Sequence, residues 1–157
     1  MRIRRKIQLA GIAVAALAGG VAGNAEAGDR TVSTGITTPL TTSNPDGTAV
    51  AGDITVDSAG SITVTAGQTA ITVDSSNDVS NGGSMNSNDA DNSNGIVLEG
   101  GNAGVITNIG SINLLETYTQ TDADSDGNLD GNVALGTNRH GIFLQAGPTF
   151  TGNITNS

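Results

Sequence analysis

The densest group of side chains that could do chemistry is an acidic run at residues 122–130. Its carboxylates stand at alternate positions, and Gly127 permits the sharp turn that would fold them toward one point. Oxygen ligands in this arrangement suit a hard cation such as Ca²⁺. The five candidate ligands are Asp122, Asp124, Asp126, the backbone carbonyl of Asn128, and Asp130.

This run departs from the EF-hand pattern. The position that should supply the last ligand, a glutamate, is Val133, and no helical periodicity flanks the run. It is closer to the loops of thrombospondin-like and other calcium-stiffened extracellular repeats, and the alternative is a solvated acidic turn that holds no ion. Asp89 and Asp91 form a smaller acidic pair without a turn glycine, which we expect only to be solvated.

Catalytic residues are not predicted. His140 is the sole histidine, and the chain has no nucleophile motif of the Gly-x-Ser-x-Gly type. One enzymatic alternative stays open, a polysaccharide lyase in which Arg139 removes a proton beside a calcium-bound uronate. That alternative is an analogy from fold, supported only by the short distance in sequence from Asp130. His140 takes the place of Asn94 in an internal repeat, so we expect it to be a turn residue.

An internal repeat in the sequence indicates which kind of framework carries these candidate residues. Residues 95–108 and 141–156 match at eight positions once an inserted Pro-Thr pair is set aside. Such a repeat predicts a core built by stacking similar units, and its period of 46 to 48 residues predicts two turns of about 20–25 residues each. The matched pairs are Gly95 with Gly141, Ile96 with Ile142, Leu98 with Leu144, Gly101 with Gly147, Gly104 with Gly152, Ile106 with Ile154, Thr107 with Thr155, and Asn108 with Asn156.

Short strands with period-2 alternation begin after Gly52, at residues 54–56, 62–64 and 71–73. Their spacing fits either an antiparallel meander or successive faces of a coil, and the repeat favours the coil. Asn108 and Asn156 would then stack as part of an amide ladder. The residues predicted to point inward are Ile96, Leu98, Ile106, Ile112, Leu114, Ile142, Leu144 and Ile154.

Polar stretches interrupt the pattern at residues 75–94 and 117–138. Both lack the apolar surface that would offset the entropy of ordering, so we predict two long loops. Residues 28–51 are rich in Thr, Ser and Gly and are predicted to be a weakly ordered leading segment, with an irregular strand within residues 31–37. The repeats would occupy residues 52–157, and the second copy stops in mid-unit, which suggests the front piece of a longer protein.

The first 27 residues have the pattern of a secretory signal peptide: a basic head, an apolar Ala-rich middle and an Ala-x-Ala site ending at Ala27. Its removal would leave Arg30 and Arg139 against fourteen carboxylates, or 2 minus 14, a net charge of −12. That charge excludes binding to nucleic acid or to anionic lipid. There is no cysteine, so stability must come from backbone hydrogen bonding and stacked side chains.

Together the Ala-x-Ala leader, the cysteine-free acidic body and the phrases Gly-Ile-x-Leu and Ile-Thr-Asn-x-Gly-Ser-Ile resemble the start of an autotransporter passenger domain from a Gram-negative bacterium. The resemblance covers residues 1–27 and 52–157. It implies an all-β fold, a right-handed parallel β-helix or solenoid, displayed at the cell surface after transit through the periplasm. The family's membrane-embedded carboxy-terminal β-barrel is missing from this chain, and the family shares no catalytic residues that could be transferred.

The expected function is that of a non-catalytic, adhesin-like scaffold that presents loops to a host or neighbouring cell surface or to an extracellular glycan. A carbohydrate-active enzyme on the same scaffold is the alternative from a different class. A calcium-binding extracellular spacer without a partner of its own is the third.

Overall fold

The computed structural model describes residues 28–131 and 138–157, and the predicted signal peptide lies outside them. These residues form strands and no helix, and so none that is long and apolar enough to span a membrane. The strands are β1 (Arg30–Val32), β2 (Gly35–Ile36), β3 (Leu40–Thr41), β4 (Ile54–Val56), β5 (Ser61–Val64), β6 (Thr69–Val73), β7 (Val79–Asn81), β8 (Ser84–Asn88), β9 (Asn94–Leu98), β10 (Ala103–Asn108), β11 (Ser111–Leu115), β12 (His140–Leu144) and β13 (Thr151–Asn156).

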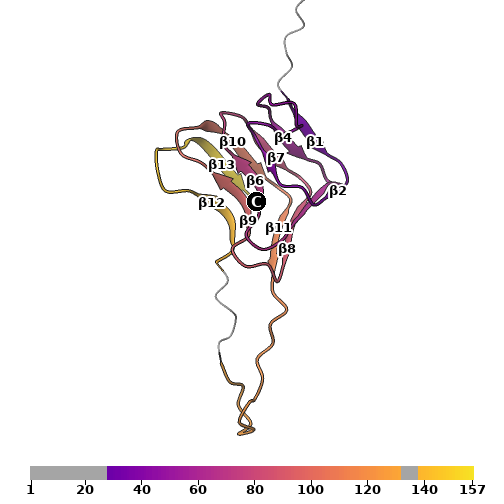
Figure 1. The fold of residues 1–157 in the computed structure, drawn as a ribbon, viewed down its shortest axis with the longest axis vertical. Helices are drawn as coiled ribbons and strands as arrows, with labels where there is room; N and C mark the ends of the chain where they lie inside the picture. Colours follow the sequence, from indigo (N-terminus) through magenta and orange to yellow (C-terminus); the bar gives the residue numbers. More distant parts are fainter. Residues whose placement is uncertain (1–27, 132–137) are drawn as a thin grey trace, which may run out of the picture.

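The strands wind into a coil whose sides are three parallel sheets (Figure 1). The sheets have the orders β1-β4-β7-β10-β13, β2-β5-β8-β11 and β3-β6-β9-β12. Each strand therefore pairs with the strand three places later, and these pairings are parallel. The predicted all-β parallel solenoid is confirmed, and the antiparallel meander is excluded.

The sequence repeat marks neighbouring windings in register. Ile96 pairs with Ile142, and Ile106 pairs with Ile154, as the alignment of the two copies predicts. The amide ladder is confirmed as well, since Asn108 Nδ2 donates to Asn156 Oδ1 at 2.7 Å.

The predicted number of windings in one repeat is wrong, whereas the predicted length of a winding, about 20–25 residues, agrees with the structure. Ile71 pairs with Ile96, 25 positions later, which is the length of an uninterrupted winding. The 46 positions from Ile96 to Ile142 also make one winding and not two. The excess comes from residues 117–138, which leave the coil after β11 and return at β12, so a loop inserted into one winding doubles the apparent period.

Residues 75–94 do not form the predicted loop; they supply β7, β8 and the first residue of β9. The alternation of inward and outward positions continues through them with small polar side chains in the core. Asn81 is fully buried and donates to Asn108 Oδ1 at 2.6 Å, and the hydroxyls of Ser87 and Ser93 bond at 2.6 Å. Because these buried groups have partners, they avoid the cost of an unsatisfied polar atom.

The interior of the coil is a stack of aliphatic side chains. In the first sheet Ile54, Val79 and Ile106 lie in one inward column, and each is at most 1 % exposed. Among the predicted inward residues, Ile96, Leu98 and Ile106 are fully buried, and Ile112 and Ile142 pack against this core. Leu144 and Ile154 are about half-exposed, at 53 % and 49 %, because they lie on the last winding.

Glycine is required at the corner between the first and second sheets. Gly83 and Gly110 directly precede β8 and β11 there. A Cβ on Gly83 would lie 2.3 Å from the carbonyl oxygens of Asp57 and Gly60, and one on Gly110 would lie 2.2 Å from the carbonyl oxygen of Gly83. Successive windings thus approach too closely at this corner for any side chain.

The coil starts earlier than predicted. Residues 28–51, expected to be weakly ordered, carry β1, β2 and β3, which pair in register with β4, β5 and β6. Arg30 opens the first of these strands, and Val32 is 2 % exposed. The Thr- and Ser-rich composition suits this winding because one face of each short strand is solvated.

Candidate functional site: an acidic loop on a braced neck

The acidic loop, residues 117–138, is the most prominent departure from the coil. It leaves between β11 and β12 and extends well away from the sheets, as Figure 1 shows for its described part. The prediction of a projecting loop is therefore confirmed for this second polar stretch. The loop folds back on itself through an antiparallel bridge between Thr121 and Asp130, whose backbone N–H donates to the Thr121 carbonyl at 2.9 Å.

Three of the five predicted cation ligands come together in the loop. One carboxylate oxygen each of Asp122, Asp124 and Asp130 lies within 4.8 Å of the other two. Two oxygens bound to the same Ca²⁺ at 2.3–2.6 Å can be at most about 5 Å apart, so the spacing is compatible with one shared ion. The arrangement is also compatible with an exposed acidic turn that holds none.

Backbone hydrogen bonds shape this turn. Asp130 Oδ2 accepts the N–H of Ala123 at 2.8 Å, and Asp122 Oδ2 accepts the N–H of Gly127 at 3.0 Å. Gly127 has φ 91°, a conformation that glycine adopts at little cost, as the sequence suggested for this position.

The other two predicted ligands have a different arrangement. The Asp126 carboxylate accepts the N–H of Asn128 at 2.8 Å, and this hydrogen bond holds the pKa of Asp126 below its ordinary value of 3.8. Asp126 is not one of the three carboxylates that lie together, and Asn128 is placed by its backbone N–H in the same turn.

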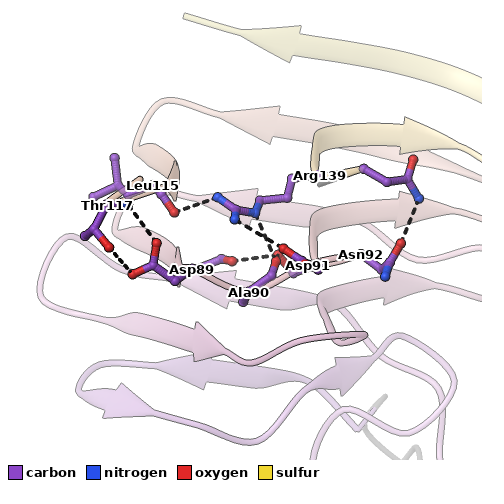
Figure 2. A network of polar contacts seen from close by, with 10 residues as sticks. Asp89, Ala90, Asp91, Asn92, Leu115, Thr117 and Arg139 are labelled. Atoms are coloured by element: carbon purple, nitrogen blue, oxygen red, sulfur yellow. Dashed lines mark hydrogen bonds and ion pairs between the residues drawn. The ribbon is translucent and has the colours of Figure 1, made fainter. Parts of the chain in front are cut away.

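At its base the loop is held by a network of polar contacts centred on Arg139 (Figure 2). The Arg139 side chain is 7 % exposed, and its guanidinium donates to the carbonyls of Ala90 at 3.1 Å and Leu115 at 2.7 Å. It also forms an ion pair with Asp91 at 3.5 Å. Arg139 thereby ties the returning end of the loop to the outgoing end and to the preceding winding.

Asp89 braces the outgoing end. Its two carboxylate oxygens accept the backbone N–H and the hydroxyl of Thr117, both at 2.7 Å (Figure 2). These hydrogen bonds lower the pKa of Asp89, so the ionised form that makes them is favoured. Asp89 and Asp91 thus do more than face solvent, contrary to expectation. Together with Thr117 and Arg139 they form the neck of the loop.

The geometry gives Arg139 and His140 structural partners. The Arg139 donors described above go to two backbone carbonyls and to Asp91, an arrangement that favours bracing over proton abstraction. His140 is not a turn residue, since it begins β12 and pairs with Asn94. Its Nδ1 lies 3.0 Å from Asn94 Oδ1, and its ring stacks on Phe143 with centroids 4.7 Å apart.

Only some of the contacts at the base of the loop could have been predicted from the sequence. Beside the neck, Asn138 Nδ2 donates a hydrogen bond to Asn92 Oδ1 at 3.2 Å, and the repeat predicts this pairing because the two residues occupy matching positions one winding apart. The role of Arg139 has no counterpart in the repeat because, among the windings in residues 28–131 and 138–157, no other carries a loop of this length.

These features define the class of the molecule as a β-solenoid with one long acidic loop on a braced neck. Comparisons with protein families, with curated proteins and with solved structures give no match for this chain.

Proposed function

We propose that this chain is an exported, non-catalytic scaffold of the autotransporter-passenger type, displayed at the cell surface, whose acidic loop contacts a partner on another cell or an extracellular glycan. The observation that carries the proposal is a stiff, in-register coil from which one braced loop projects. A rigid framework with a single projecting loop suits recognition, because loops on rigid scaffolds present side chains without deforming the core.

A loop-exchange variant tests the recognition role. Residues 89–93 connect the matching strands β8 and β9 one winding earlier, so their sequence, Asp-Ala-Asp-Asn-Ser, can replace residues 116–139. We expect the variant to keep the circular dichroism spectrum of the coil and to lose binding to epithelial cells, measured by flow cytometry with a fluorescent label on the protein. Equal binding by both proteins would contradict the role given to the loop.

Export is tested separately. When the whole chain is expressed in a Gram-negative host, we expect a periplasmic product whose mass shows cleavage after Ala27. Ala25→Arg is the control, because a large charged residue at the Ala-x-Ala site should block processing. A full-length cytoplasmic product from the unaltered chain would overturn export.

We also propose that the acidic loop binds Ca²⁺ through Asp122, Asp124 and Asp130, which would stiffen its far end. The proposal is supported by the three gathered carboxylates and by the backbone hydrogen bonds that shape the turn. Outside the cell even a weak calcium site can fill, since extracellular modules bind in the range of about 10⁻⁴–10⁻³ M.

Calcium should therefore raise the thermal midpoint of the protein. At a concentration about ten times the Kd, binding to the native state alone adds about 1.4 kcal/mol, or roughly 4–8 °C for a domain of this size. Scanning calorimetry with and without calcium measures this shift, and the double variant Asp122→Asn/Asp130→Asn should abolish it. Glu99→Gln, a carboxylate outside the loop, is the matched control and should keep it. An unshifted midpoint in the unaltered chain would rule out the site.

A further inference from the structure

The outer face of the first sheet carries an open groove of 190 Å³. It lies over β4, β7 and β10, each of which has a neighbouring strand on both sides. The groove is smaller than the roughly 300–1,000 Å³ of pockets that hold drug-sized ligands, so it suits a group of about one sugar ring. The lining residues whose side chains face outward are Asp53, Thr55, Asp78, Ser80, Val105 and Thr107.

A row of hydroxyl groups runs along this groove. Thr55 pairs with Ser80, and Ser80 pairs with Thr107, so the three side chains follow one another at the strand spacing of about 4.8 Å. None of the three hydroxyls has a hydrogen-bond partner within residues 28–131 and 138–157. A hydroxyl group both donates and accepts, so the row can bond to the hydroxyls of a sugar, which do the same.

Two carboxylates stand beside the hydroxyl row. Asp53 and Asp78 directly precede β4 and β7, at matching positions one winding apart. Asp53 Oδ1 accepts the N–H of Asp78 at 2.9 Å and the Nδ2 of Asn77 at 3.2 Å, and Asp78 Oδ1 accepts the N–H of Val105 at 2.8 Å. Their Oδ2 atoms have no partner in the described windings, and residues 31–138 contain no Lys or Arg. The groove therefore attracts a cationic group and repels an anionic one.

We propose that this groove binds an amino sugar with an unacetylated amine, carried by an extracellular glycan. The ammonium group would lie between the Oδ2 atoms of Asp53 and Asp78, where its hydrogen bonds are charge-assisted. The sugar hydroxyls would bond to the hydroxyl row, and Val105, which is 43 % exposed, would contact the C–H face of the ring.

Other ligands fit only part of the groove. A neutral sugar would leave the two carboxylates without a counter-charge, and a uronate would add a third negative charge. A lysine side chain would leave the hydroxyl row without partners, because its ammonium is a point charge on a flexible aliphatic stem. The inference rests on the proposed function only for the export that brings the chain to an extracellular glycan, since the groove lies on a different sheet from the strands that carry the acidic loop.

Isothermal titration calorimetry of the purified chain with a glucosamine trimer tests the proposal, at about pH 6, where amines are protonated and carboxylates ionised. We expect Asp53→Asn/Asp78→Asn to weaken binding about ten-fold or more, because asparagine keeps the Oδ1 acceptor and removes the charge. Asp124→Asn/Asp126→Asn is the matched control: it changes the net charge equally, but in the acidic loop, and should leave binding unchanged.

Two further ligands separate charge from sugar recognition. The N-acetylated trimer lacks the ammonium groups and trilysine lacks the sugar hydroxyls, so both should bind about ten-fold more weakly or worse. These comparisons need no substitution, so they hold even if a variant folds poorly. Thr55→Val/Thr107→Val keeps the shape of both side chains and removes their hydroxyls, and it should weaken binding of the glucosamine trimer but not of trilysine.

Equal binding of trilysine and the glucosamine trimer would reduce the contact to charge alone and overturn the proposal. It would also be overturned by equal binding of the acetylated trimer, by full binding in Asp53→Asn/Asp78→Asn, or by a glucosamine trimer that does not bind. The loop-exchange variant should bind the trimer as the unaltered chain does. Because purified protein is used, failure here leaves the tests of export and of the loop unaffected.

Discussion

Replacing Ile106 with alanine should lower the free energy of unfolding by about 2–5 kcal/mol. Its side chain is fully buried between Val79 on one side and Ile154 on the other, so truncation leaves a cavity that two flanking windings enclose. Each winding contributes one inward side chain to this column, and parallel strand pairing holds the surrounding backbone in place. The cavity therefore has little room to collapse. Urea denaturation followed by circular dichroism measures the change.

Ile154→Ala is the matched control for this experiment. Ile154 occupies the same column in the last winding, and its side chain is 49 % exposed. Truncation there removes only partly buried surface and leaves no enclosed cavity, so we expect a loss of about 1 kcal/mol or less. Equal losses from the two substitutions would contradict the stacked column.

The repeat made the register of the last windings predictable. Aligned glycines and aliphatic residues fix which strands neighbour one another, because a shift by one residue would turn every inward side chain outward. For this reason the pairing of Ile106 with Ile154 could be inferred from the sequence alone. The number of windings in one repeat could not be inferred, since the period measured from two copies includes any loop inserted between them.

Hydrophobic periodicity does not reveal the polar windings, because several of their inward-facing residues are polar. In β7 the inward positions are Val79 and Asn81, and the latter reads as a loop residue when it is considered alone. A sequence signal was nevertheless present: Val79-Ser-Asn and Gly83-Ser84 repeat the order of Ile106-Thr-Asn and Gly110-Ser111 at a distance of 27 residues. Patterns of inward asparagine and corner glycine therefore identify windings that hydrophobic periodicity does not.

The arrangement of the acidic loop was predictable in part. Spacing predicts five cation ligands, and the structure brings three of them together, Asp122, Asp124 and Asp130. Spacing could not show that the Asp126 carboxylate accepts the backbone N–H of Asn128, because the N–H groups of a short acidic loop can be paired in several ways. The neck was unpredictable for a different reason: Arg139 contacts residues 24 and 49 positions away, which only the coil brings near.

Replacing Asn108 with alanine should cost about 2–3 kcal/mol of stability, more than a hydrogen-bonded surface asparagine would. Asn108 is 4 % exposed; its Oδ1 accepts from Asn81 at 2.6 Å, and its Nδ2 donates to Asn156 at 2.7 Å. Truncation leaves the fully buried Asn81 amide without its strong acceptor, and a carbonyl at 3.4 Å is a poor substitute. Urea denaturation measures the loss, and a value below about 0.5 kcal/mol would show that the ladder adds nothing.

Asn113→Ala is the matched control, because Asn113 makes the same kind of asparagine–asparagine hydrogen bond on the outer face of the coil. Asn113 Nδ2 donates to Asn86 at 2.9 Å between neighbouring windings, but both side chains lie where water can replace the bond, so we expect a loss of about 0.5 kcal/mol. The double variant Asn81→Val/Asn108→Val removes the orphaned amide, together with the Asn81 acceptor of the Gly83 N–H at 3.2 Å. Val56 already occupies this column one winding earlier, so the site accepts valine, and removing both amides should recover most of the stability lost in Asn108→Ala. If the double variant is less stable than Asn108→Ala, the asparagines stabilise the coil by their hydrogen bonds and not merely by avoiding an unpaired one.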